Sequence, residues 1–374
     1  MKLKIKKNIL LENLNYVSRA LSNRNIIPIL NGILFELTSE GLSLTSTDND
    51  LTIKTFIEKK DILQIENEGK IVILGKYLLD IIRKLPSDDV VIEEIDGGKA
   101  IISTETSKYN LNCFEVSDFP NIKIEENDRP IKLSVEGFKD LINQTVFATS
   151  NQESRPLLTG VNIKLVGNLL ESVATDSYRL AKKSIKLNIT FDENINIVIP
   201  ARNIMELVKI LEIDEDEITM FCFNNKVLFK YKNLLFQSSL LNGTYPNTDT
   251  LIPTDYEIVL KVDCSKFYDA IDRASILSAI KDKNIIQIET KDNNLVITSS
   301  SPEVGKVEEV MLVNIIKGKN IRISFSSKYM LEALKSFKNP EEIMIMLNGE
   351  IKPIILKESE NSDLTQLILP FKTY

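Results

Sequence analysis

The residues of this sequence best suited to catalysis are two clusters of carboxylates. They lie in STDND at 46–50 and in IDEDEI at 213–218, and neighbouring carboxylates can hold Mg²⁺ in a nuclease. IDEDEI also has the composition of a solvated turn between a helix and a strand, and nothing nearby completes a site. A metal-dependent nuclease therefore stays as an alternative, while we expect no catalytic residue, no metal and no cofactor.

Histidine is absent from all 374 residues. This removes Ser-His-Asp and Cys-His catalysis and the zinc sites that depend on imidazole. The sequence contains neither a GxxxxGK[ST] loop nor a GxGxxG motif. Cys113, Cys222 and Cys264 are far apart and form no metal motif, so we interpret them as reduced structural thiols. These residues favour a binding protein over an enzyme.

One amphipathic helix pattern occurs three times at an interval of 126 residues. Its copies are KYLLDIIRKL (76–85), RNIMELVKIL (202–211) and KYMLEALKSF (328–337). Cations align at the first and eighth positions and anions at the fifth, between apolar residues at helical spacing. A run rich in β-branched residues precedes each copy and predicts a strand that leads into the helix. An earlier helix pattern opens each repeat.

Three repeats of this length fill the chain, and each is long enough to form a domain. The turn FPN at 119–121 returns as YPN at 245–247. We predict an α+β fold of three tandem similar domains over 1–124, 128–250 and 254–374. Each domain is expected to pack two helices on antiparallel sheets of about six to eight short strands.

Charge is segregated by type of element. The predicted helices, at 11–24, 76–85, 136–148, 201–211, 265–281 and 327–338, carry a net charge of +6, whereas the whole chain carries −7. One explanation is that cations simply decorate exposed helices, as in a protein-only scaffold. The other is that the helices face a common polyanion, and without base-reading clusters this predicts sequence-independent contacts with DNA phosphates.

Nine short motifs occur in the order in which one known family has them. They are PILNGILFEL (28–37), STDNDLTI (46–53), SDFPN (117–121), RPLLTGV (155–161), VATDSYRLA (173–181), NGTYPN (242–247), RASILS (273–278), SSSPE (299–303) and LILPFKTY (367–374). With them the whole chain closely resembles the bacterial DNA sliding clamps, the beta subunits of DNA polymerase III.

The resemblance implies a DNA clamp fold in which three domains form half of a ring and two chains close it head to tail as a homodimer. Such a ring encircles double-stranded DNA as a processivity factor and is not an enzyme. It tethers the alpha subunit of DNA polymerase III and the clamp loader through their clamp-binding peptide motifs. No stretch is long and apolar enough for a membrane span, and we expect a cytoplasmic protein.

The resemblance also implies a pocket for partner peptides between the second and third domains. The matching positions are Leu158, Thr175, Ser177, Tyr178, Arg179, Leu180, Pro246, Leu251, Ile351, Pro353, Leu367, Ile368, Leu369, Pro370 and Phe371. Two departures stand out, because the family often has Gly-His where this chain has Ser177-Tyr178, and a basic residue where it has Thr250. Without the resemblance, these mostly apolar residues also fit the core of a domain junction.

Two further sets of residues complete the expectations. For DNA contact the resemblance implies Arg24 and Gln152, and the helical charges add Lys76 and Arg202. For the interface between two chains it implies Tyr109 and Leu111 on an edge strand of the first domain. Ile276 and Leu277 in the third domain are the expected counterpart.

Overall fold

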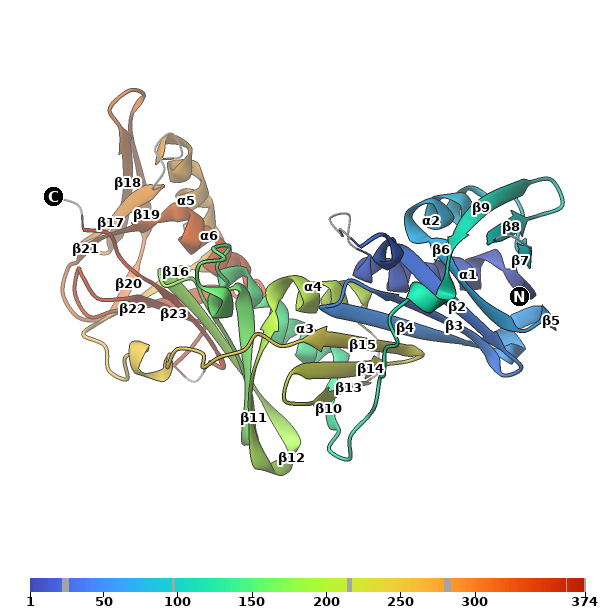
Figure 1. Cartoon of the computed structure of the whole chain (residues 1–374). Coiled ribbons are helices and arrows are strands. Elements are labelled where there is room, and N and C mark those ends of the chain that lie inside the picture. Colours follow the sequence, from blue (N-terminus) through green and yellow to red (C-terminus); the bar gives the residue numbers. More distant parts are fainter. Residues whose placement is uncertain (22–26, 96–97, 214–216, 279–283, 361, 373–374) are drawn as a thin grey trace. The chain divides into compact units, whose positions relative to one another are not determined.

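The computed structural model describes residues 1–21, 27–95, 98–213, 217–278, 284–360 and 362–372. Within these ranges six α-helices and 24 strands form the predicted α+β fold (Figure 1). The helices are α1 (Lys7–Val17), α2 (Gly75–Lys84), α3 (Val135–Asn143), α4 (Ala201–Ile210), α5 (Cys264–Ser278) and α6 (Ser327–Lys335). None of these described helices combines the length and apolar character that a transmembrane helix needs.

Three of the predicted helices have other boundaries in the structure, and the one expected over 327–338 ends at Lys335. The helix expected over 11–24 begins at Lys7, because strand β1 (Lys2–Lys6) leads directly into it, and it ends at Val17 before a 3-10 turn over Ser18–Ala20. The helix expected over 136–148 ends at Asn143. The Thr145 hydroxyl donates to the carbonyl of Leu141 at 2.8 Å there, a side-chain bond that competes with helix continuation.

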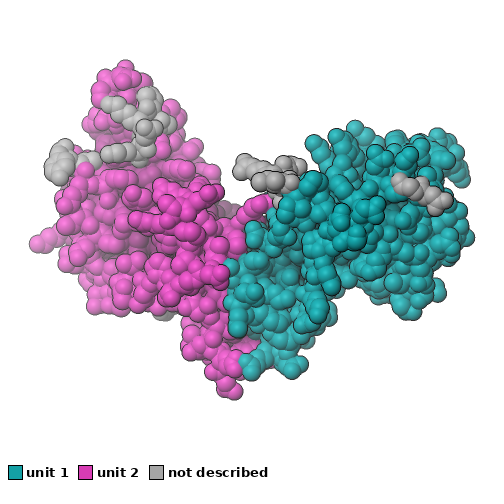
Figure 2. All heavy atoms as spheres, in the orientation of Figure 1, with its two compact units in different colours: residues 1–136, 203–240 teal, residues 137–202, 241–374 magenta. Residues whose placement is uncertain are grey.

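The described residues form two compact units (Figure 2). The first contains residues 1–136 and 203–240, and the second contains residues 137–202 and 241–374. The borders of the units fall inside the second sequence repeat. Spatial compactness and sequence repetition therefore divide the chain at different places.

The first unit is built on a 13-stranded antiparallel sheet in the order β10-β13-β14-β15-β4-β3-β2-β6-β9-β8-β7-β1-β5. Helix α1 packs on β3 and β4 and also contacts α2, and both helices turn one apolar face inward. The strands besides β1 are β2 (Gly32–Thr38), β3 (Gly41–Thr47), β4 (Leu51–Glu58), β5 (Ile62–Asn67), β6 (Gly69–Leu74), β7 (Asp89–Ile95), β8 (Lys99–Ser103), β9 (Lys108–Phe114), β10 (Ile131–Ser134), β13 (Glu217–Cys222), β14 (Lys226–Tyr231) and β15 (Leu234–Ser239).

The second unit contains a seven-stranded sheet in the order β11-β12-β24-β23-β22-β16-β20 and a four-stranded sheet in the order β19-β18-β17-β21. Helix α5 packs on β17, β18, β19 and α6 around a buried core that includes Phe267 and Phe325. The strands are β11 (Gly160–Thr175), β12 (Arg179–Pro200), β16 (Ile258–Asp263), β17 (Ile285–Lys291), β18 (Asn294–Ser301), β19 (Gly305–Leu312), β20 (Asn314–Lys317), β21 (Arg322–Ser326), β22 (Glu342–Leu347), β23 (Ile354–Lys357) and β24 (Leu364–Ile368).

Strands β11 and β12 contradict the expectation of short strands only. They have 16 and 22 residues, and register shifts between Leu165 and Leu169 accommodate the unequal lengths. No glycine or proline interrupts the chain between Arg179 and Ile199, so nothing in that stretch ends the strand.

Strand pairing joins the repeats twice, with the same register each time. Strand β4 of the first repeat pairs with β15 of the second, from Leu51 with Ser238 to Thr55 with Leu234. Strand β12 of the second repeat pairs with β24 of the third, from Arg179 with Ile368 to Lys183 with Leu364. In both junctions the first residue of one strand faces the fifth residue of the other over five antiparallel pairs.

Candidate functional site

The turn between β11 and β12 is held rigidly by its own side chains. The Asp176 carboxylate accepts the backbone N–H groups of Tyr178 and Arg179 at 2.9 and 3.0 Å, and the Thr175 hydroxyl donates to the Arg179 carbonyl at 2.6 Å. Ser177 adopts a φ of 78°, a left-handed conformation that glycine takes without strain. This locked turn leaves the Tyr178 side chain 52% exposed.

Arg179 connects this turn to helix α6. Its Nε donates to Asp176 Oδ2 at 3.0 Å, one terminal nitrogen pairs with the Glu332 carboxylate, and the other donates to the Phe147 carbonyl at 2.7 Å. The guanidinium also lies 4.6 Å from the ring centroid of Tyr329. Arg179 is only 8% exposed, so its polar atoms bond to other groups of the protein.

The apolar floor beneath the turn is a buried cluster shared by β11, β12 and the third repeat. Leu158, Leu180 and Leu367 belong to it, together with Tyr245. The Tyr245 hydroxyl accepts the Thr175 N–H at 3.2 Å, and burial raises the pKa of Tyr245 above its usual range. Tyr245 therefore stays neutral and supports the turn from below.

Four of the predicted apolar positions are exposed at the surface of the second unit. Tyr178, Leu251, Ile351 and Leu369 are between 36% and 63% exposed, and the Leu369 N–H donates to the Tyr178 carbonyl at 2.9 Å. Of the fifteen predicted positions, Leu158, Thr175, Arg179, Leu180, Leu367 and Ile368 are buried, whereas Ser177, Tyr178, Pro246, Leu251, Ile351, Pro353, Leu369, Pro370 and Phe371 are half-buried or exposed. The second unit thus combines a fixed turn, an apolar floor and an exposed apolar rim, which suits an extended peptide with apolar anchors.

Five residues that shape this site were not among the predicted positions: Phe147, Asp176, Tyr245, Tyr329 and Glu332. Phe147 and Tyr329 flank the Arg179 guanidinium, and Glu332 neutralises it. Glu332 occupies the anion position shared by the three repeated helices, so the repeat did carry a signal for it. Tyr329 lies in the same repeated helix, but no pattern in the sequence indicated that it belongs to the site.

The residues predicted to contact DNA are exposed where the structure describes them. Lys76 lies on α2, Arg202 on α4 and Gln152 in the loop before β11, while Arg24 lies outside the described residues. On α4 the positions that follow Arg202 bury Ile204 and Leu207. Lys76 and Arg202 are therefore on the exposed faces of α2 and α4.

The predicted interface residues lie beside open strand edges. Tyr109 and Leu111 belong to β9, whose residues 108–112 pair only with β8 among the described strands. Ile276, 69% exposed, and the half-buried Leu277 belong to α5, which packs on β19. Within the described chain β19 pairs only with β18, so its outer edge is open as well.

The candidate metal ligands are used in other ways. The Asp48 carboxylate accepts the backbone N–H groups of Asp50 and Leu51 at 3.1 and 2.8 Å, as Asp176 does in the second repeat. The described residues contain no group of three metal-ligating side chains, and residues 214–216 of IDEDEI lie outside them. Burial raises the pKa of Cys222 to about 12 and that of Cys113 to about 11, so these thiols stay protonated.

Repeated pairs of helices on antiparallel sheets, joined by strand pairing, define the class of DNA clamp folds. Family models for the N-terminal, central and C-terminal domains of the DNA polymerase III beta subunit match residues 1–123, 132–247 and 249–372. The proteins named beta sliding clamp from Bacillus subtilis and Staphylococcus aureus are each 39% identical over 100% of both chains.

Solved structures agree with these sequence matches. The DNA polymerase sliding clamp of Bacillus subtilis superposes with a TM-score of 0.97 at 39% identity. The DNA polymerase III beta chain of Streptococcus pneumoniae gives 0.95 at 32%, and both comparisons cover 100% of each chain. The chain belongs to the DNA polymerase III beta subunit family, the DNA sliding clamps that act as processivity factors in replication.

Proposed function

We propose that two copies of this chain close head to tail into a ring that encircles duplex DNA and tethers the replicative polymerase, the clamp loader and other factors. Each copy contributes three domains to the ring, formed by residues 1–124, 128–250 and 254–374. The ring works as a mobile tether inside the cell and does not itself catalyse a reaction.

The observation that carries this proposal is the register shared by the two junctions within the chain. Each pairs a five-residue stretch of one repeat with the next repeat in the same way. Among the described strands, the third repeat has an equivalent open edge on β19, and the first repeat has one on β9. Applying the shared register to a second copy pairs Gly305 with Asn112 and continues to Glu309 with Lys108. Two copies that use both edges head to tail close into a dimeric ring without a free edge at these junctions.

The DNA-binding surface is assigned to the exposed faces of the repeated helices. Their long lysine and arginine side chains, such as Lys76 and Arg202, can reach phosphates while the helix backbone stays at a distance. Contacts of this kind are individually weak, numerous and blind to base sequence. They suit a ring that must slide along DNA.

The partner site is assigned to the locked turn, its apolar floor and the exposed rim of the second unit. An extended peptide with leucine and phenylalanine anchors fits this chemistry, and burying two anchors contributes about 3–6 kcal/mol. After the cost of association, this gives roughly micromolar affinity. Weak binding suits a site whose occupants must exchange. Tyr178 and Thr250 at the rim are the positions where partner preference is set.

One experiment tests both the ring and its register. The variant Tyr109→Cys with Glu308→Cys, made with Cys113→Ser, places two cysteines opposite each other in the proposed intermolecular pairing. Directly opposed residues in an antiparallel pair are close enough for a disulfide. Oxidation in the presence of circular plasmid should give a covalent dimer that stays on the DNA at high salt and is released when the plasmid is linearised.

The matched control moves one cysteine by two residues, as Tyr109→Cys with Val310→Cys in the same background. Because it keeps the strand face but breaks the register, it should form far less covalent dimer. Equal crosslinking of both variants would refute the register. Crosslinked dimer that washes off circular and linear plasmid alike would refute encirclement.

A further inference from the structure

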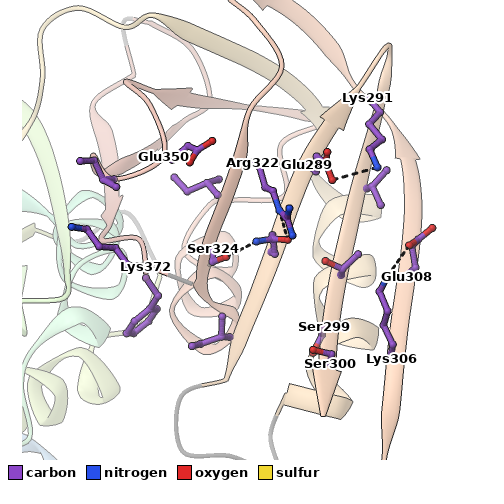
Figure 3. Close-up of a pocket in the computed structure, with 17 residues that line it drawn as sticks. Glu289, Lys291, Ser299, Ser300, Lys306, Glu308, Arg322, Ser324, Glu350 and Lys372 are labelled. Atoms are coloured by element: carbon purple, nitrogen blue, oxygen red, sulfur yellow. Dashed lines mark hydrogen bonds and ion pairs between the residues drawn. The ribbon is translucent and has the colours of Figure 1, made fainter. Parts of the chain in front are cut away.

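The outer face of the four-stranded sheet of the second unit is hollowed into a groove of about 960 Å³. Its floor is mostly polar and includes Gln287 on β17, Thr298 on β18, and Arg322 and Ser324 on β21, besides the apolar Ile285 and Val296. Figure 3 labels Arg322 and Ser324. The alternating residues Ile286 and Ile288 of β17 point to the buried core instead. The groove is therefore a built feature of the sheet face, separate from the apolar floor of the partner site.

The groove is continuous with the proposed partner site. Ile351 and Phe371, both assigned to that site, line the groove as well. The Phe371 N–H donates to the carbonyl of Ser324 at 2.7 Å, which fixes the end of the partner site against strand β21. A peptide leaving the apolar rim beside Phe371 thus reaches the polar floor directly.

Within the groove, Arg322 is held ready to bind a carboxylate. Its Nε donates to Gln287 Oε1 at 2.6 Å, and Gln287 Nε2 donates to the Ser324 hydroxyl at 3.1 Å (Figure 3). Among the described residues the terminal nitrogens of Arg322 have no hydrogen-bond or ion-pair partner. A guanidinium fixed through Nε and open at its terminal nitrogens matches the two oxygens of a carboxylate.

The charges of the groove are distributed unevenly. At the β19 end and along β17, Lys306 pairs with Glu308 and Lys291 pairs with Glu289, each at 3.4 Å. The remaining charged residues that line the groove are Arg322, Lys372 and Glu350, and Arg322 lies directly opposite Glu289 in the β17–β21 pair. Figure 3 shows Lys372 and Glu350 on the side of the groove away from the Lys306–Glu308 pair. With four cations and three carboxylates, the lining of the groove carries a net charge of +1.

We propose that this groove binds an acidic segment flanking the apolar anchor of the same partner peptide, with Arg322 receiving a carboxylate. This inference rests on the proposed function, because the anchor must occupy the partner site for the flank to reach the groove. It adds a charge criterion to the choice among partners that share similar apolar anchors.

The test measures binding of synthetic peptides to the full-length protein by fluorescence anisotropy. The peptides share one leucine- and phenylalanine-containing anchor and carry four glutamates, serines or lysines at either end. At one end, the glutamate flank should tighten binding about three- to five-fold over the serine flank, the scale of one partly exposed charge-assisted contact. Arg322→Gln should abolish this gain, and Lys291→Gln, which removes a paired cation at the far end, should preserve it.

Other results would contradict the acidic-flank proposal, the partner site or both. Equal affinities for glutamate and serine flanks on the unaltered protein, or a gain that survives Arg322→Gln, would overturn the acidic-flank proposal and leave the partner site intact. Failure of every peptide to bind would overturn the partner site, and the flank proposal with it. Displacement of the acidic peptide by a mixed-sequence oligonucleotide, dependent on Arg322, would assign the groove to nucleic acid instead.

Discussion

At the scale of single residues, Arg179 shows how a position assigned to binding can be structural. Its guanidinium is shared by Asp176, Glu332 and the Phe147 carbonyl, and it is almost fully buried. Replacement by alanine leaves the carboxylates of Asp176 and Glu332 without this partner, and the Asp176 side chain is largely buried. We expect Arg179→Ala to lower the free energy of unfolding by about 3 kcal/mol, measured by urea denaturation.

The control for this prediction is Arg155→Gln. Arg155 is an exposed arginine that donates one hydrogen bond, to the Ser177 hydroxyl at 2.8 Å, and we expect its loss to cost less than about 1 kcal/mol. Similar losses for both variants would show that burial of Arg179 is not what makes it important. The resemblance placed Arg179 at the site, but no pattern in the sequence distinguishes a guanidinium that faces a peptide from one enclosed by its own chain.

At the scale of elements, β2 and β11 both begin with a glycine at a position where a side chain would clash with neighbouring residues. A Cβ on Gly160 would lie 2.7 Å from Val198 Cγ1 and 2.8 Å from the Ile199 carbonyl oxygen, and one on Gly32 would lie 2.5 Å from Val72 Cγ1. The carbonyl cannot rotate away as a side chain can. We expect Gly160→Ala to destabilise the fold by about 1–3 kcal/mol in thermal or urea unfolding.

The exposed Asn168 on the same strand serves as the matched control, since Asn168→Ala should stay within about 0.5 kcal/mol of the unaltered protein. If Gly160→Ala did not change the stability, β11 and β12 would have to move apart at Gly160 at little cost, which would contradict this prediction. The sequence was sufficient to predict where strands lead into helices, at Gly75, Ala201 and Ser327. It was insufficient for the ends of α1 and α3 and for the long β11–β12 hairpin, which depend on local side-chain bonds and on strand register.

At the scale of the whole molecule, the proposed ring depends on a contact between chains around β9, β19 and α5. Ile276 is 69% exposed on the described chain and lies on α5, which packs on the edge strand β19. Ile276→Ala with Leu277→Ala should shift the protein from dimer toward monomer in sedimentation velocity. Peptide binding at the partner site should remain, because that site is built from the second unit of one chain.

Ile189 provides the comparison, as it is 62% exposed on β12 and is assigned to no interface. Ile189→Ala should sediment like the unaltered protein, and a dimer that survives the Ile276 and Leu277 changes would contradict the proposed contact. The threefold repeat, visible at 126-residue spacing, predicted the α+β architecture. The division into two compact units was not visible, because the strands that cross between repeats pair residues far apart in the chain.

The shared register of β4–β15 and β12–β24 has a consequence for how such a ring comes apart. Two of its three kinds of junction are tethered by the polypeptide, so each opened pair of edges remains at a high effective concentration and closes again. The proposed third kind, between β9 and β19 of different chains, has no covalent tether and would reassociate only by encounter in solution. Dilution therefore acts on this junction alone, and any machinery that opens the ring meets least resistance there.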